Sequence, residues 1–139
     1  MADHVVPDII DGNARASASD APCAAGELAG LRDALRRFAA ERDWEQFHTP
    51  RNLATALSVE AAELLEPFQW LTDEQSCGLA PQTLASVREE MADVLLYLVR
   101  LADVLDVDLL AAARDKMVLN AQKYPIDKAR GNSRKYTGL

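Results

Sequence analysis

The sequence has few of the residues that soft-metal sites, disulfide frameworks and membrane spans require. Its 139 residues include only two cysteines, Cys23 and Cys77, and only two histidines, His4 and His48. The cysteines have neither the number of a disulfide framework nor the spacing of a zinc site, and two histidines exclude a His-rich metal site. No apolar run approaches the roughly 20 residues of a membrane span, and no basic segment precedes an apolar one at the N-terminus. We therefore expect a cytoplasmic protein with no membrane partner.

Aromatic and β-branched residues are also scarce. Aromatic side chains make up 6% of the chain, whereas apolar residues in total make up 49%. Alanine and leucine dominate that apolar fraction, and both lose little rotamer freedom in a helix. No alternating strand pattern or internal repeat is present. The composition therefore favours an all-α protein with enough apolar residues for one core.

Basic residues are scarce in most of the chain, which has a net charge of −7. Residues 1–113 carry 8 basic and 20 acidic side chains, a balance of −12, whereas residues 114–139 carry 7 basic and 2 acidic, a balance of +5. An acidic body is a poor surface for nucleic acid, so no nucleic-acid partner is expected. The basic C-terminal segment is either a solvated tail or a binding surface for a small phosphorylated ligand and its metal.

Helical periodicity predicts four helices. They are expected over residues 28–43, 53–66, 83–105 and about 108–124, with loops at 44–51 and 71–82. Asn52, Thr83 and either Asp106 or Asp108 are the expected N-caps, and Pro67 and Pro125 mark helix ends. Residues 1–26 have no sustained period and are predicted to be a disordered tail. The expected organisation is a helical domain at 27–125 followed by a basic tail at 126–139.

The third helix has an apolar stripe that is typical of a bundle core. We expect it to be buried; its members are Leu84, Val87, Met91, Val94, Leu95, Leu98, Leu101 and Leu105. Because every helix is amphipathic or largely apolar, we predict a four-helix bundle that retains some apolar surface for a second subunit.

Two pairs of carboxylates lie on the apolar faces of consecutive helices. Glu60 and Glu63 are three residues apart on the second helix, and Glu90 and Asp93 are three apart on the third. Residues at this spacing project from the same side of a helix. Neighbouring antiparallel helices would therefore present four carboxylates to one another, and such a cluster needs protonation or a cation.

All-oxygen ligation points to Mg²⁺, with Mn²⁺ as a possible substitute, rather than to zinc. A di-iron bundle would need Glu-x-x-His pairs, and His48 lies outside any such pair. The alternative interpretation is that these side chains are ordinary surface carboxylates on amphipathic helices.

The two acidic motifs, separated by 26 residues, belong to a longer set of motifs. The others are FAAERDWEQFHTPR at 38–51, FQW at 68–70, EEMADVLLYLVR at 89–100, KMVLNAQKYP at 116–125 and RKYT at 134–137. Over residues 28–137 the chain resembles the MazG-like branch of the all-α nucleoside triphosphate pyrophosphatases. It is most similar to the dCTP pyrophosphatases within that branch.

The resemblance implies Mg²⁺-dependent hydrolysis of a nucleoside triphosphate between its α and β phosphates. It also implies a homotetramer with sites built from more than one chain; a dimer is the fallback. By motif position, the carboxylates that would hold Mg²⁺ and perform catalysis are Glu60, Glu63, Glu90 and Asp93. The residues that would contact the nucleotide are Trp44 and Trp70 at the base, Tyr97 at the sugar, and Lys116 and Asn120.

The chain departs from the dCTP enzymes at Leu35, where they have a histidine nine residues before the first tryptophan. We expect dCTP or a modified dCTP to be the substrate. The same chemistry on dUTP, an oxidised nucleotide or phosphoribosyl-ATP is the second hypothesis, and a non-catalytic helical oligomerisation or binding module is the third. In that last case Trp44 and Trp70 would only pack in a core or interface.

Overall fold

The computed structural model describes residues 24–138, and all regular elements within this range are helical. This confirms the predicted all-α class. The long helices are α1 (Ala24–Ala40), α2 (Pro50–Leu65), α4 (Pro81–Val104) and α5 (Leu109–Lys123). The short elements are α3 (Asp73–Ser76), α6 (Ile126–Ala129) and 3-10 turns at Glu45–Phe47 and Tyr136–Gly138.

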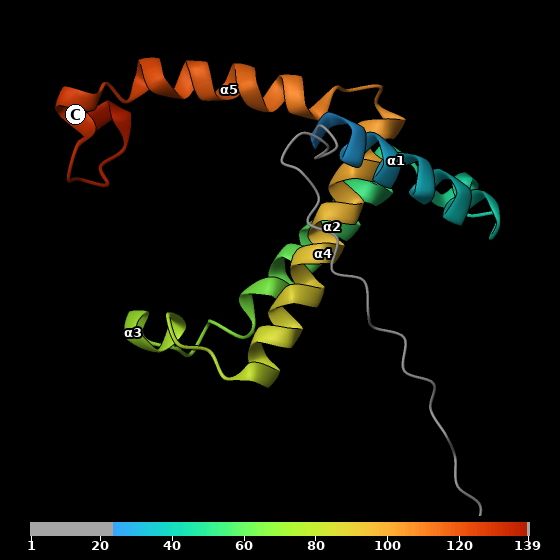
Figure 1. Ribbon diagram of the computed structural model, residues 1–139, viewed down its shortest axis with the longest axis horizontal. Helices are drawn as coiled ribbons and strands as arrows, with labels where there is room; N and C mark the ends of the chain where they lie inside the picture. Colours follow the sequence, from blue (N-terminus) through green and yellow to red (C-terminus); the bar gives the residue numbers. More distant parts are fainter. Residues whose placement is uncertain (1–23, 139) are drawn as a thin grey trace, which may run out of the picture.

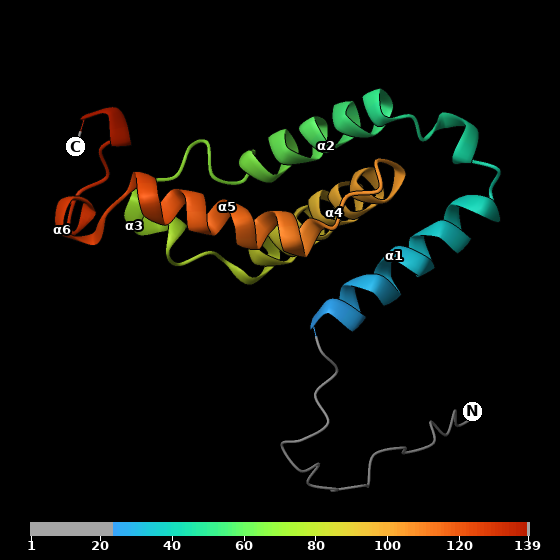
Figure 2. The same cartoon turned by 90° about the horizontal axis from the view of Figure 1, so that it is seen from above.

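The antiparallel pair of α2 and α4 forms the centre of the chain. Helix α1 packs across the C-terminal half of α4, as Figures 1 and 2 show. Helix α5 extends away from the other long helices and, apart from its first turn, is exposed. The four predicted long helices are thus present, but in a single chain the fourth does not pack along the other three.

The helix ends differ from the predicted ones by a few residues. Thr49, not Asn52, caps α2, since its Oγ1 accepts from the Asn52 backbone N–H at 3.2 Å. Helix α4 starts at Pro81, before the predicted cap Thr83, because proline is well suited to the first helical turn. Asp108 caps α5, and its carboxylate accepts from the Ala111 N–H at 2.9 Å.

The first helix begins and ends earlier than predicted. It starts at Ala24, so residues 24–26 of the predicted disordered tail are helical; the rest of that tail lies outside the described residues. It ends at Ala40 rather than near Asp43 because Asp43 is left-handed, with φ 53°, and the Trp44 N–H returns to the Ala39 carbonyl at 3.0 Å. This reversal brings Trp44 back against α1.

The core is small and lies where α1, α2 and α4 meet. The buried apolar residues among those described are Ala39, Leu53, Val87, Val99 and Ala102. In the predicted stripe of α4, Val87 is buried, but the prediction is wrong for four residues that are 43–57% exposed: Leu84, Met91, Leu95 and Leu105. They lie exposed because α5 does not fold back over that side of α4.

Leu53 is the largest fully buried side chain, with 2% of its surface exposed. We expect Leu53→Ala to lower the free energy of unfolding by about 2–5 kcal/mol, because it leaves a cavity between α2 and α4. Urea denaturation measures this loss. Leu65→Ala, at a position of the same helix that is 61% exposed, is the matched control and should change stability by less than about 0.5 kcal/mol. Equal losses in the two variants would contradict the described packing.

Candidate metal and nucleotide site

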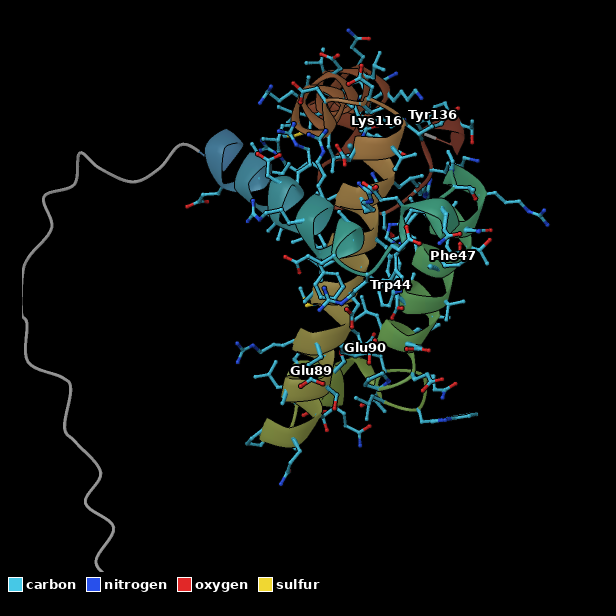
Figure 3. The ribbon with its side chains drawn as sticks, turned by 90° about the vertical axis from the view of Figure 1, so that its right-hand side faces the viewer. Trp44, Phe47, Glu89, Glu90, Lys116 and Tyr136 are labelled. Atoms are coloured by element: carbon cyan, nitrogen blue, oxygen red, sulfur yellow. The ribbon has the colours of Figure 1, made fainter. Side chains whose placement is uncertain are left out.

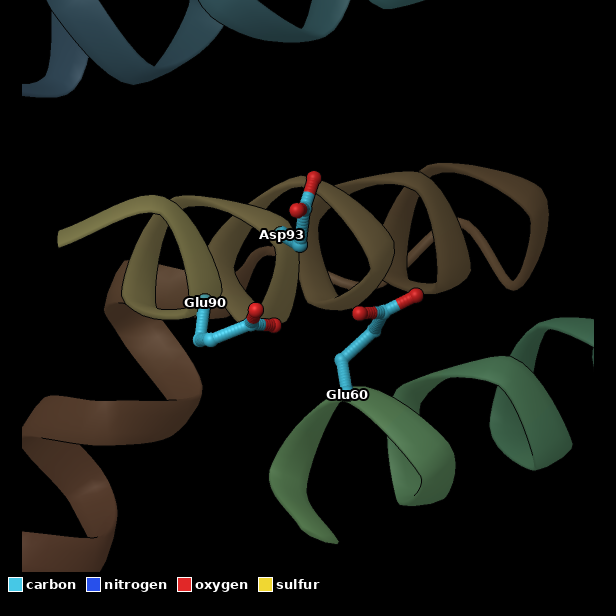
Figure 4. A group of neighbouring side chains, drawn as sticks. All are labelled: Glu60, Glu90 and Asp93. Carbon is cyan, nitrogen blue, oxygen red and sulfur yellow. The ribbon is translucent and has the colours of Figure 1, made fainter. Parts of the chain in front are cut away.

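Three carboxylates converge between α2 and α4. Glu60 reaches from α2 toward α4, which carries Glu90 and Asp93 one turn apart (Figure 4). One oxygen from each side chain lies within 4.8 Å of the others. The antiparallel pairing of the helices therefore brings one carboxylate of the first predicted acidic motif to both carboxylates of the second.

The cluster is negatively charged and lacks a basic partner. Among the described residues, no arginine, lysine or histidine forms a salt bridge with these three side chains. Burial raises the pKa of Glu60 above its ordinary value, and the charges of the neighbouring carboxylates raise it further. The pKa of Glu90 is raised for the same reasons. The chain alone thus holds ionised carboxylates together at a free-energy cost.

These carboxylates fit a hard divalent cation. They offer only oxygen donors, which Mg²⁺ and Mn²⁺ prefer, and no sulfur or imidazole ligand lies among them. A cation would offset the repulsion that raises the two pKa values. The observed donor set therefore agrees with the predicted metal, whereas the di-iron alternative lacks its histidines.

Glu63, the fourth predicted carboxylate, is outside this group of three. Its side chain is exposed on the last turn of α2. It is nevertheless close enough for its charge to raise the pKa values of Glu60 and Glu90. Glu63 thus lies beside the cluster rather than in it.

A largely apolar pocket of about 210 Å³ adjoins the acidic cluster, with Asp93 in the wall of both. Trp44 packs edge-on against Phe38, with ring centroids 5.8 Å apart, and lies 6.4 Å from the ring of His48. The pocket is lined by Leu35, Phe38, Trp44, His48, Leu53, Asp93, Leu96, Tyr97 and Arg100. Two predicted nucleotide contacts, Trp44 and Tyr97, therefore share a cavity beside the cluster.

Three other predicted nucleotide contacts do not reach this pocket. Trp70 follows α2 and is 86% exposed. Lys116 and Asn120 are exposed on α5, and Figure 3 shows Lys116 well away from Glu90. Within one chain, the structure thus assembles one part of the predicted site and leaves these three side chains apart from it.

Two pocket residues, His48 and Arg100, were not predicted from the sequence. Arg100 is 9% exposed, and its Nε donates to Nδ1 of His48 at 3.1 Å. A basic residue within an otherwise apolar helical segment, LLYLVRLA at 95–102, was the available signal for Arg100. The loop position of His48 gave no comparable signal, because only the turn after α1 brings it to α4.

The comparisons with known proteins agree with this geometry. The MazG-like family matches residues 55–139, which is more than half of the chain. The chain belongs to the MazG-like family. The match includes both acidic motifs of the cluster.

Curated relatives of this MazG-like chain extend the similarity to the pocket. It is 51% identical over 114 residues to dCTP pyrophosphatase 1 of Homo sapiens and 49% identical to that of Rattus norvegicus. Each comparison covers 81% of this chain and 67% of the relative. A solved pyrophosphatase from Archaeoglobus fulgidus superposes with a TM-score of 0.68 at 42% identity, covering 71% of this chain and 93% of that one. None of the described helices is long and apolar enough to cross a membrane.

Proposed function

We propose that the protein is a nucleoside triphosphate pyrophosphatase that converts dCTP, or a modified dCTP, to the monophosphate and pyrophosphate. The observation that carries the proposal is the adjacency of the three-carboxylate cluster and the aromatic pocket, which share Asp93. A nucleotide fits this arrangement, since its charged phosphates could bind a cation held at the cluster while its planar base enters the aromatic pocket. The named activity of the relatives, at about 50% identity, supports the same reaction.

The carboxylates of α2 and α4 would hold Mg²⁺ in this proposal. When bound, the cation neutralises charge on the phosphate oxygens and polarises the phosphorus that is attacked. Glu60, Glu90 and Asp93 are the residues that would hold it, and they come from two packed helices. Glu63, beside the cluster and exposed, is free to accept a proton from the attacking water.

The aromatic pocket would bind the base. The Trp44 indole offers a flat face to a nucleobase, and stacking of this kind tolerates any base. Tyr97, also in the pocket wall, lies on α4 four residues after Asp93, and it would contact the sugar in this proposal. Selection among bases then depends on hydrogen-bonding groups in the pocket.

Assembly of several chains would complete the site. Helix α5 carries exposed apolar side chains, among them Met117 at 72%, Val118 at 60% and Leu119 at 49%. Such a surface is typical of a subunit interface. A homotetramer would cover it and could bring Lys116 and Asn120 of one chain to a nucleotide bound at another, with a dimer as the smaller alternative. A nucleotide-pool enzyme of this kind would act in the cytoplasm.

We expect a charge on the apolar surface of α5 to disrupt this assembly. The double variant Met117→Glu, Val118→Glu places two carboxylates where the proposed interface excludes water, which costs several kcal/mol. Light scattering at micromolar concentration should then report a smaller species, and hydrolysis should fall with it. Gln122→Glu, at an exposed position of the same helix, is the control and should keep the native mass. A wild-type protein that is monomeric would contradict the proposed assembly.

The experiment that tests the function is pyrophosphate release from a panel of dNTPs with and without Mg²⁺. We expect release from dCTP that requires the cation and is slower with the other nucleotides. Preference for dUTP, an oxidised nucleotide or phosphoribosyl-ATP would keep the chemistry and change the substrate. No release from any of them would leave the chain as a helical binding module.

A further inference from the structure

A chain of polar contacts links the surface of α1 to the pocket. The Arg36 Nε donates to Oδ1 of Asp103 at 2.9 Å, and the Arg100 Nη1 donates to Oδ2 of the same carboxylate at 2.7 Å. The Arg100 Nε then donates to Nδ1 of His48 at 3.1 Å. Three segments that are distant in sequence, α1, α4 and the loop before α2, thus meet in one network.

Asp103 anchors this network in a buried place. Its side chain is 4% exposed and that of Arg100 is 10% exposed. The hydrogen bond from Arg36 is the main factor that holds the pKa of Asp103 below its ordinary value, so the carboxylate stays ionised. A buried charge-assisted pair of this kind fixes the plane of the guanidinium and therefore the direction of its Nε–H.

The contact with Arg100 determines which nitrogen of His48 carries the proton. A guanidinium can only donate, so the Nδ1 that it contacts must be an unprotonated acceptor, and the ring proton is on Nε2. Burial and the charge of Arg100 lower the pKa of His48, which keeps the ring neutral, although Glu45 acts in the opposite direction. The Nε2–H forms no hydrogen bond with any residue in the range 24–138.

The free donor belongs to a side chain of the pocket wall. His48 lines the pocket together with Trp44 and Asp93, so a base stacked on Trp44 would lie beside the imidazole. In cytosine the ring nitrogen N3 is an acceptor, whereas in uracil and thymine it carries a hydrogen. A fixed Nε2–H donor of His48 would form a hydrogen bond with N3 of cytosine, but it would face the N3–H donor of uracil or thymine. Two facing donors both stay unpaired, which is costly in a desolvated pocket.

We propose that Arg100, held by Asp103 and Arg36, is a positioning residue that fixes His48 as a hydrogen-bond donor, and that this donor selects bases with an acceptor at the ring nitrogen. This inference rests on the proposed function, because it assigns base selection to the same pocket. His48 is the residue that contacts the base, and Arg100 acts only through it. The network thus converts a histidine that is ordinarily able to donate from either nitrogen into one with a single defined donor.

The test replaces Arg100 by methionine, which has a similar length and no donor. In Arg100→Met the ratio of kcat/KM for dCTP to that for dUTP should fall about tenfold, mainly through a higher KM for dCTP. Arg36→Gln, at a half-exposed position, should lower the ratio less, by about threefold, because Arg100 keeps its own contact with Asp103. Arg88→Met, on an exposed face of the same helix, is the matched control and should leave the ratio unchanged.

A spectroscopic readout separates this inference from the proposed function. Nitrogen-15 NMR of His48 near pH 7.5 should show the Nε2–H form in the wild-type protein and a mixture of both tautomers in Arg100→Met. The expected mixture together with a lower ratio supports the proposal. An unchanged ratio in a folded Arg100→Met variant, or an Nδ1–H form in the wild type, would overturn it. If the wild type hydrolyses no nucleotide, the proposed function fails, and so does base selection, while the spectra still report whether Arg100 fixes the tautomer.

Discussion

Asp93→Asn is expected to lower kcat by about a thousandfold or more while the protein stays folded. Asp93 is the residue that the cluster and the pocket share, so its carboxylate lies where the phosphates of a bound nucleotide would meet the cation. Loss of one charged ligand removes several kcal/mol of transition-state stabilisation, and each 1.4 kcal/mol corresponds to a factor of ten in rate. Pyrophosphate release under saturating Mg²⁺ and dCTP measures the effect.

Glu89→Gln is the matched control for the acidic site. Glu89 lies on the same helix, is exposed, and is not one of the three grouped carboxylates (Figure 3). Its removal should change kcat by less than about threefold, since Glu89 is exposed to solvent and offers no ligand atom to the group of three, although its charge contributes to the raised pKa of Glu90. Wild-type turnover from Asp93→Asn would refute the site. Equal losses of kcat in the two variants would indicate that hydrolysis depends on the overall negative charge of this surface rather than on a defined cation site.

The metal-free protein should gain stability when a clustered carboxylate is neutralised. The pKa of Glu90 is raised in the folded state above its ordinary 4.5, so the folded state binds more protons than the unfolded one above that pH. The free energy of unfolding of the metal-free protein therefore falls as the pH rises from 4.5 through the raised pKa of Glu90. Glu90→Gln removes the effect: without metal it should raise the melting temperature at pH 7, and the gain should vanish below about pH 4.5. Calorimetry in EDTA at pH 7 and below about pH 4.5 measures the difference in melting temperature between the variant and the wild type. In excess Mg²⁺ at pH 7, the wild type should be the one that melts at the higher temperature.

The sequence was informative about the helices because their signals are local. Apolar periodicity located all four long helices, and the two proline residues at 50 and 81 begin α2 and α4 within a few residues of the predicted starts. The turn at Asp43 was missed because a left-handed aspartate has no distinctive sequence pattern. The exposed stripe of α4 was also missed, since periodicity shows that a face is apolar but not whether the same chain covers it.

The acidic cluster was more predictable than the pocket. Three-residue spacing predicts which carboxylates share a face of a helix, and the antiparallel pairing of α2 and α4 brings Glu60 to Glu90 and Asp93. The same spacing did not show that Glu63 lies outside the group. The pocket depends on long-range packing instead: His48 and Arg100 are 52 residues apart and meet only through the tertiary fold. The predicted nucleotide contacts of Lys116 and Asn120 cannot be assessed within one chain. They depend on a neighbouring chain and stay a prediction.

Trp44→Ala is expected to raise the KM for dCTP by about tenfold to a hundredfold and to change kcat little. The Trp44 ring lies in the wall of the pocket, 45% exposed, and is oriented by its edge-on contact with Phe38. Loss of a stacking surface costs about 1–3 kcal/mol of base binding, and the phosphates and the cation are not affected. Initial rates over a range of dCTP concentrations at saturating Mg²⁺ separate KM from kcat.

Trp70→Ala provides a comparison with an indole that is 86% exposed and away from the pocket of its own chain. If assembly brings Trp70 to the base, as the family resemblance implies, its removal should raise KM too, but only in the oligomer. In the α5 variant with Glu at 117 and 118, any residual hydrolysis should then be insensitive to Trp70→Ala and remain sensitive to Trp44→Ala. Unaltered kinetics in Trp44→Ala would contradict the proposal that the base stacks on this indole.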